Sequence, residues 1–281
     1  MKITRRDFLK TTALTSLYFA GFGAPGYTNS GTKKNLVVIM LRGGMDGLCA
    51  LPIKGDKHFE KLRSKINLDR TLTLSSDFHL HPALKTFKSL WDQNQSAAVH
   101  ATNIPYTGRS HFDGQNLMES GGKIPYQEKT GWLGRGMKIA GLTGNGLALA
   151  LPMPLLIRGV PMNNNYFPVG HKLPYPSTLK MIQEAYKQYD EKLLSENLEI
   201  IQTRELSNTS SDESWVLASN AANELSKPDG PKVAVFEVDG FDTHAAQGGT
   251  NGAHADCLSD YDNIIRSLKS SMTKEAFNNT L

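Results

Sequence analysis

The sequence predicts an α/β fold in which helices sandwich a mostly parallel sheet. Residues 36–41 are a continuous apolar, β-branched run, and residues 232–238 are another run of the buried type, which is typical of strands buried on both faces of a parallel sheet. Apolar residues at helical spacing lie between these runs, and each run ends in a glycine-containing turn. Hydrophobic residues make up 39% of the 281-residue chain, which is enough to bury a sizeable core.

The first 24 residues have the features of a twin-arginine export signal. A basic segment around Arg5 and Arg6 precedes a short, mildly apolar stretch that ends in small residues at Ala24. The stretch 13–24 is shorter than the ~20 apolar residues that a membrane span needs, although an uncleaved N-terminal anchor stays open. We therefore expect residues 1–24 to engage the twin-arginine translocase and the mature protein to be periplasmic or otherwise exported.

Further elements are expected between and after the two strands. Residues 25–34 are small and polar, as in a linker, so the folded domain is expected to span 35–281. The expected elements, in chain order, are a helix that begins near Pro82, a strand over 97–101, a helix from about Ser110, long loops over 121–175 that contain one strand at 147–156, a helix over 178–206, a serine-rich link over 207–214 and a helix from His254.

Charge and cysteine content exclude several classes of protein. The formal net charge is +4, and residues 1–24 supply three of these charges, so the remainder is nearly neutral and lacks the basic character of a nucleic-acid-binding domain. No long apolar segment follows the signal, so no transmembrane partner is inferred. The two cysteines, Cys49 and Cys257, exclude a disulfide framework and a Cys-x-x-Cys metal site. Whether these two thiols pair with each other stays open.

Polar residues follow both predicted strands, at the edge where open parallel sheets bind their ligands. Asp242 and His244 lie in the loop after the second strand, and a carboxylate with an imidazole is an ordinary ligand pair for zinc or another divalent ion. Asp46 follows the first strand through two glycines and is a candidate for a further carboxylate ligand. Two ligands alone are a weak motif, so a solvated loop and a turn role for Asp46 stay open.

A second group of candidate residues lies where a helix is expected to begin. Ser110 precedes Asp113 by three residues, as in a capping box with Asp in place of Glu, so one interpretation of Ser110 is a helix cap. The other is a nucleophile, because a helix N-terminus binds phosphate or sulfate groups and nearby cations would activate the hydroxyl. Arg109 and Arg42 are candidates to bind anionic oxygens. His111 is open as a ligand, an acid–base group or a helix surface residue.

Three segments together resemble a known family. Leu-Arg-Gly-Gly-Met-Asp-Gly at 41–47, Thr-Gly-Arg-Ser-His-Phe-Asp-Gly-Gln at 107–115 and Gly-Phe-Asp-Thr-His-Ala-Ala-Gln at 240–247 occur in this order behind the twin-arginine leader. The set is similar to that of the Tat-exported domain-of-unknown-function 1501 family, which itself resembles the alkaline phosphatase and sulfatase superfamily. The resemblance spans nearly the whole chain.

The resemblance implies an alkaline-phosphatase-like sheet with a divalent metal ion, such as zinc or calcium, at the strand ends. It implies that Asp242 and His244 are metal ligands, Asp46 a further ligand and Ser110 the nucleophile. Two features depart from the pattern. The Cys-x-Pro-x-Arg segment of true sulfatases is absent, and the sequence reaches Leu281 without the Glu-Phe-Gly-Arg and Asp-His segments that follow in the family. The resemblance therefore implies a domain truncated at its C-terminus, with an incomplete metal site.

We accordingly expect an exported protein with a phosphatase- or sulfatase-like scaffold, which would hydrolyse a phosphate or sulfate ester with a bound metal ion. Ser110, Arg109 and His111 are the candidate catalytic residues, and no organic cofactor is expected. Whether the chain is an active enzyme stays open, because the C-terminal ligand segment is missing. The alternatives are a non-catalytic protein that binds or assembles in the envelope, and an inactive truncated fragment.

Overall fold

The computed structural model describes residues 34–149, 153–161, 163–165, 175–188 and 213–281. The chain divides into a larger unit, Met1–Tyr166 with Ser214–Leu281, and a smaller unit, Phe167–Glu213. The expected export signal, nearly all of the linker, the C-terminal part of the helix expected over 178–206 and most of the serine-rich link lie outside the described residues.

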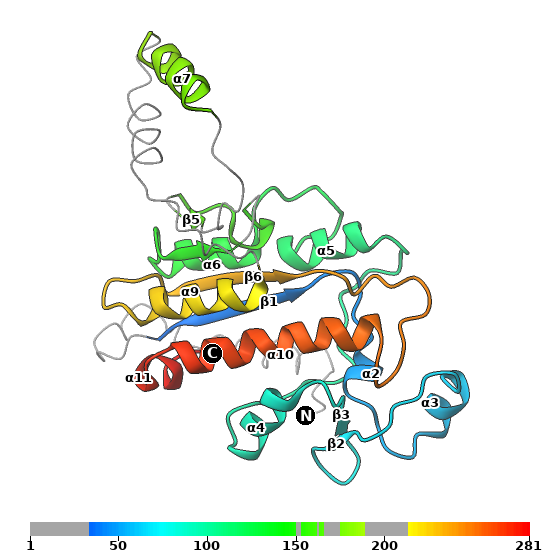
Figure 1. Cartoon of the computed structure of the whole chain (residues 1–281). Coiled ribbons are helices and arrows are strands. Elements are labelled where there is room, and N and C mark those ends of the chain that lie inside the picture. Colours follow the sequence, from blue (N-terminus) through cyan, green and yellow to red (C-terminus); the bar gives the residue numbers. More distant parts are fainter. Residues whose placement is uncertain (1–33, 150–152, 162, 166–174, 189–212) are drawn as a thin grey trace, which may run out of the picture. The chain divides into compact units, whose positions relative to one another are not determined.

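A parallel sheet of four strands forms the centre of the larger unit (Figure 1). The strands lie in the order β1-β6-β4-β5, and each pair of neighbours is parallel. Their bounds are β1 Leu36–Leu41, β4 Gly146–Ala148, β5 Asn164–Asn165 and β6 Val233–Val238. The predicted α/β class with a parallel sheet is confirmed at this level. A separate antiparallel pair is formed by β2 Leu72–Thr73 and β3 His79–Leu80.

The helices of the larger unit alternate with these strands along the chain. They are α2 Gly47–Ala50, α3 Lys57–Leu62, α4 Lys85–Asp92, α5 His111–Ser120, α6 Trp132–Ile139, the 3-10 helix η1 Leu155–Ile157, α9 Ser214–Ser226, α10 Ala253–Ser271 and α11 Lys274–Asn278. The smaller unit contains α7, Pro176–Gln188, which corresponds to the start of the helix expected over 178–206. In the described parts of the chain, no helix is both long and apolar enough to cross a membrane.

Helices cover both faces of the sheet. The side chains of β6 are therefore buried on both faces. Ala234, Phe236 and Val238 face a core that also contains residues of α9 and α10. Val233 and Val235 face a second core, which contains residues of α6 and η1. All five side chains are at most 3% exposed. Because alternate residues of a strand point to opposite faces, a strand with two covered faces needs apolar residues on both of them. The exception in β6 is Glu237, which is half-buried and pairs with Arg42.

Sequence signals located three helices correctly. The helix expected near Pro82 is α4, and the helix expected from His254 is α10. The cap predicted at Ser110 is confirmed, because its Oγ accepts a hydrogen bond from the backbone N of Asp113 (3.2 Å) at the start of α5. Gly121 ends this helix in a left-handed conformation (φ 67°), which glycine adopts without steric cost.

Two predicted strands differ from the structure. Residues 97–101 form no strand, so this prediction is wrong: their side chains at 97–99 are exposed, and Ala101 has a positive φ of 55°. None of the described strands pairs with this short run. Of the strand expected over 147–156, residues 147 and 148 belong to β4 and residues 155 and 156 to η1, while 150–152 lie outside the described residues. Pro154 begins that turn by accepting a hydrogen bond from Ile157, and a proline cannot donate to a sheet.

The region expected as loops over 121–175 contains a helix, α6. Gly134 and Gly136 lie within it and lower its intrinsic helix propensity, so its pattern is weak in the sequence. Tertiary packing explains why residue 134 is a glycine. A Cβ at Gly134 would lie 2.2 Å from the carbonyl oxygen of Arg158, so α6 can approach the residue after η1 only because the side chain is missing.

Substitution of the two glycines of α6 should have opposite effects. Gly134→Ala is expected to lower the free energy of unfolding by about 1–3 kcal/mol, because the added methyl group overlaps the Arg158 carbonyl. A Cβ added to Gly136 would meet no neighbouring atom within 4 Å. Gly136→Ala should therefore raise the free energy of unfolding by roughly 0.5–1 kcal/mol through helix propensity alone. Urea unfolding measures both, and equal stabilities would contradict the close approach of α6.

Candidate functional site

The turn after β1 lies beside the loop after β6, because the two strands pair in register up to their last residues. Gly43 and Gly44 form this turn with positive φ values of 103° and 81°. A Cβ on Gly43 would lie 2.4 Å from the backbone N of Asp242, and one on Gly44 would lie 2.7 Å from Cε1 of His111. Both glycines are therefore required for the close approach of these two residues, which come from different elements.

His111, Asp242 and His244 form one exposed group, which we call the His–Asp cluster. The Nε2 atoms of His111 and His244 lie 3.2 and 3.1 Å from the same Oδ1 of Asp242. The two rings are perpendicular, with centroids 6.5 Å apart. The side chains of His111 and Asp242 are 45% and 40% exposed, and that of His244 is 80% exposed. The structure thus joins two of the predicted metal ligands with the predicted catalytic His111, within reach of solvent.

The backbone of His244 is unusual. Its φ of 51° lies in the left-handed region, which residues with a side chain rarely adopt. Such a conformation costs on the order of 1–3 kcal/mol and persists only where the surrounding structure imposes it. The loop therefore holds an exposed imidazole against Asp242 in a backbone conformation that glycine would adopt more easily.

The segment before α5 is held by a residue that the sequence analysis did not single out. The Tyr106 hydroxyl donates to Oδ2 of Asp113 (3.0 Å) and accepts from the backbone N of Ser110 (3.4 Å). Gly108 lies against the same hydroxyl, at a position where a Cβ would overlap it. Arg109 is exposed and has no ion-pair partner in the part of the chain that the structure describes. The position of Tyr106 just before the Thr-Gly-Arg-Ser segment is a signal that could have identified it.

Arg42 is not a free anion-binding group, contrary to the sequence-based expectation. Its guanidinium donates to Gln115 (3.0 Å) and Glu119 (2.8 Å) of α5 and also pairs with Glu237 of β6. Burial by itself would lower the pKa of Arg42, but its bonds to Glu237 and Glu119 outweigh that effect and raise it. Glu119 is 3% exposed and also accepts from the backbone N of Leu156 (3.0 Å). Arg42 therefore fixes α5 on the sheet.

Asp46, predicted as a metal ligand, lies in a separate polar group. Its side chain caps α2 by accepting from the backbone N of Cys49 (3.3 Å). It also pairs with Arg63 and accepts from Nε2 of Gln247 (2.9 Å). Burial would raise the pKa of Asp46, but these hydrogen bonds and the charge of Arg63 outweigh burial and lower it. No hydrogen bond or ion pair among the described residues joins Asp46 to the His–Asp cluster.

The two cysteines are free thiols, which resolves the alternatives that the sequence left open. Cys49 is buried beside Asp46. Burial, followed by the hydrogen bond and charge of Asp46, raises the pKa of Cys49 to about 12. The thiol therefore stays protonated at neutral pH in the protein as it stands, which does not favour a nucleophilic role.

The donor atoms present determine where a metal ion would fit. Within the described ranges, no three His, Cys, Asp or Glu side chains are grouped so that they could hold an ion as they stand. The Asp46 carboxylate does not fit, because Arg63 already occupies it. The His–Asp cluster has the donor types that zinc prefers, and its nitrogen–oxygen separations of 3.1 and 3.2 Å approach the roughly 3.3–3.6 Å between neighbouring donors of a tetrahedral zinc site.

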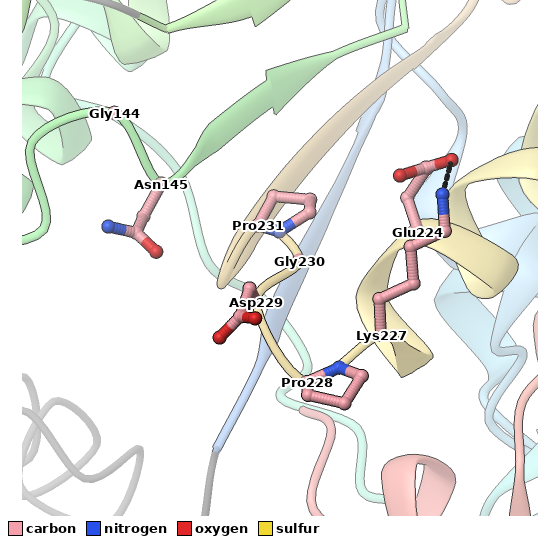
Figure 2. Close-up of a pocket in the computed structure, with 8 residues that line it drawn as sticks. All are labelled: Gly144, Asn145, Glu224, Lys227, Pro228, Asp229, Gly230 and Pro231. Carbon is pink, nitrogen blue, oxygen red and sulfur yellow. Dashed lines mark hydrogen bonds and ion pairs between the residues drawn. The ribbon is translucent and has the colours of Figure 1, made fainter.

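A pocket lies at the end of the sheet where β4 and β6 begin (Figure 2). It is lined by Gly144, Asn145, Glu224, Lys227, Pro228, Asp229, Gly230 and Pro231. These residues precede β4 and β6 or end α9, so the pocket is at the amino ends of parallel strands, whereas the His–Asp cluster is at their carboxyl ends. Glu224 and Lys227 pair with each other across 2.6 Å. None of the predicted site residues lines this pocket, so the His–Asp cluster is the candidate site.

Two fully buried histidines lie beneath the loop that carries Gln247. His81 accepts at Nδ1 from the backbone N of Ala83 (3.1 Å) and contacts the carbonyl oxygen of Gly249 through Nε2 (2.9 Å), so its ring proton is on Nε2. His254 packs edge-on against His81 and Phe241. It is 2% exposed, and its Nε2 has no partner among the described residues.

Comparison with known proteins identified no relative: no family model, no curated protein and no solved structure matches this chain. The three-motif resemblance therefore stays a prediction. The geometry of the His–Asp cluster is independent of it, because that cluster follows from the pairing of β1 with β6 and from the position of α5.

The stability of the larger unit should depend on the protonation of His254. Burial lowers the pKa of His254; Asp46 opposes this, whereas His81 and Arg63 add to it. The unfolded chain then binds a proton that the folded chain does not. The free energy of unfolding should accordingly fall as the pH drops below about 6.5, by at most about 1.4 kcal/mol per pH unit.

Urea unfolding between pH 7.5 and 5.5 measures this dependence. His254→Leu removes the titrating group and should flatten the curve, whereas His58→Gln at an exposed position should leave it unchanged. A wild-type curve with the same slope as that of His254→Leu would contradict the assignment.

Proposed function

We propose that this chain is an exported protein that binds a divalent cation at the carboxyl edge of its sheet and hydrolyses a phosphate or sulfate ester there. The observation that carries the proposal is the convergence of two imidazole Nε2 atoms on Oδ1 of Asp242. Open parallel sheets bind their ligands at this edge. The motif resemblance to the domain-of-unknown-function 1501 family, and through it to an alkaline-phosphatase-like fold, supports the same function.

Asp242, His244 and His111 would hold the cation. The His244 side chain is 80% exposed, so it can turn to place its nitrogen beside that of His111 without disturbing the core. Gly44 leaves room for the His111 ring, and Gly43 leaves room for Asp242. A divalent cation bound there would act as a Lewis acid that stabilises negative charge on the ester oxygens.

Ser110 and Arg109 supply the groups that face an anionic ester. Ser110 lies at the N-terminus of α5, where backbone N–H groups and the helix dipole favour an anion. Its Oγ accepts the capping bond from the backbone N of Asp113, so the hydroxyl proton is not used by the cap. As the new Oγ–phosphorus or Oγ–sulfur bond forms, the ester bond to the alcohol would break and the proton would pass to the departing alcohol oxygen; water would then hydrolyse the Ser110 ester. Arg109 is exposed beside it and would bind the non-bridging oxygens. Arg42 and Asp46 have no direct part, because each is already paired inside the protein.

A second candidate is a non-catalytic protein that binds a ligand or assembles in the envelope. The pairing of Asp46 with Arg63 favours it, because a predicted third ligand is occupied by an internal cation. Metal binding and ester hydrolysis separate the two candidates: a binding protein turns over no ester.

The test measures zinc binding by calorimetry and the hydrolysis of p-nitrophenyl phosphate and p-nitrophenyl sulfate. The wild type should bind one zinc ion per chain and release p-nitrophenol. Asp242→Asn should weaken zinc binding by more than about tenfold, because even partners of metal ligands alter affinity 10–100-fold. Asp239→Asn, an exposed change in the same loop, is the matched control and should bind as the wild type does.

His244→Gly separates function from folding. It removes an imidazole and relieves the left-handed backbone, so zinc binding should weaken while the thermal midpoint is unchanged or higher. Absence of zinc binding by the wild type would refute the metal site. Zinc binding without turnover of either ester would favour the binding protein.

Export is tested through the arginine pair. Replacement of Arg5 and Arg6 by lysine keeps the charge but removes the feature that the twin-arginine translocase recognises, so the protein should stay in the cytoplasm. Lys10→Arg is the matched control and should be exported. Cell fractionation in a bacterial host with and without this translocase provides the measurement, and export of the lysine variant would contradict the assignment.

A further inference from the structure

A second tyrosine lies near Tyr106 at the start of α5. Tyr126 donates its backbone N–H to Oδ1 of Asn116, a residue of α5, across 2.7 Å. Partial desolvation, then the Asp113 carboxylate and then Tyr106 raise the pKa of the Tyr126 phenol, so its hydroxyl lies near these two groups. We call Tyr106 and Tyr126 the tyrosine pair. The polar ends of both rings are directed at Asp113, the residue whose backbone N–H is capped by Ser110.

The backbone of Tyr126 is held in a conformation that a tyrosine rarely adopts. Its φ of 62° lies in the left-handed region, which is an outlier for a bulky side chain. The ring gains little from burial in return, because Tyr126 is 52% exposed. A strained residue persists only where its surroundings impose it, and the bond to Asn116 does so here. The fold thus holds an aromatic ring at the surface in a fixed position.

Tyr106 brings the tyrosine pair to the proposed nucleophile. Its hydroxyl accepts from the backbone N of Ser110 (3.4 Å) and donates to Oδ2 of Asp113 (3.0 Å). A Cβ on Gly108 would lie 2.2 Å from this hydroxyl, and one on Gly114 would lie 3.6 Å from Cδ1 of the ring, so the half-buried ring lies against the first turn of α5. Because both hydroxyls are directed at Asp113, the parts of the rings that a ligand can contact are apolar.

We propose that the tyrosine pair binds the alcohol part of the ester, so that the substrates are aryl phosphates or aryl sulfates. This inference rests on the proposed function, because it takes the anionic group to bind at Ser110. An ester bound there has its alcohol part within reach of the pair, since the Tyr106 hydroxyl contacts the backbone of Ser110. Aromatic rings stabilise one another beyond the area they bury, and a ring that is already fixed loses little entropy on binding.

A cationic alcohol such as choline is the alternative, because ammonium groups also bind over aromatic faces. The surrounding charges favour the aryl group. Asp113 accepts from Tyr106 and lies near the Tyr126 hydroxyl, so its carboxylate is already engaged inside the protein. The exposed guanidinium of Arg109, one residue before Ser110, would repel a cation.

Binding of two phosphonates to the full chain, in the presence of zinc, tests the proposal. Phenylphosphonate and methylphosphonate carry the same anionic group on a carbon–phosphorus bond that is not an ester, so binding is measured without turnover. In NMR titrations, phenylphosphonate should bind at least about fivefold more tightly. The ring resonances of Tyr126, assigned in isotope-labelled protein by comparison with Tyr126→Phe, should shift with phenylphosphonate and not with methylphosphonate.

Variants of one exposed tyrosine test the assignment to this surface. Tyr126→Ala removes the ring, so the ratio of the two affinities should fall at least about threefold. Tyr126→Phe keeps the ring and should keep the ratio within about twofold of that of the wild type. Tyr175→Ala removes another exposed tyrosine (82% exposed) and is the matched control, which should retain the full ratio. If Tyr126→Ala fails to fold, the ring shifts in the wild type still decide the question.

Several results would overturn the proposal: no binding of either phosphonate, equal affinities for both, a ratio that survives Tyr126→Ala, or tighter binding of phosphocholine than of phenylphosphonate. Its failure is distinct from that of the proposed function. Hydrolysis of the p-nitrophenyl esters with equal phosphonate affinities would retain the hydrolase and remove the aryl preference. Binding of phenylphosphonate that depends on Tyr126, without turnover of either ester, would support aryl recognition by a binding protein.

Discussion

The ion pairs of Arg42 hold together the elements that build the carboxyl edge of the sheet. One guanidinium at the end of β1 bonds to Glu237 on β6 and to Gln115 and Glu119 on α5. Glu119 is almost fully buried, so removal of Arg42 would leave a charge without a partner inside the protein. The network is therefore a constraint on geometry more than a source of net stability. It fixes α5, and with it His111, at a distance that Gly43 and Gly44 allow.

Burial divides the polar residues of this edge into two groups with different consequences. Asp46, Arg63 and Gln247 satisfy one another and tie the turn after β1 to the loop after β6. Their hydrogen-bonding capacity serves the fold. His111, Asp242 and His244 are exposed, and His244 is held in a left-handed conformation against Asp242. Groups that are exposed and conformationally constrained are available to a ligand, which is why the proposed function rests on these three residues and not on Asp46.

The two long strands show that similar sequences can have different surroundings. Both are largely apolar, yet β6 has strands on both sides, whereas among the described residues the outer side of β1 is paired with Thr280 and Leu281 near its start. The half-buried state of β1 follows from its position in the sheet order and not from its composition.

Local patterns in the sequence determined the α/β class, both long strands, the cap of α5 at Ser110 and the loop that joins Asp242 to His244, because each depends on neighbouring residues alone.

Only the tertiary structure decided the rest. The run 97–101 has apolar residues but pairs with none of the described strands, and it is irregular. The helix α6 forms despite two glycines, because Gly134 allows close packing against Arg158. Arg63, far from any motif, pairs with Asp46, and β6 brings Asp242 to His111 from another part of the chain. Contacts between distant segments depend on the order of strands and the fit of surfaces, which local periodicity does not encode.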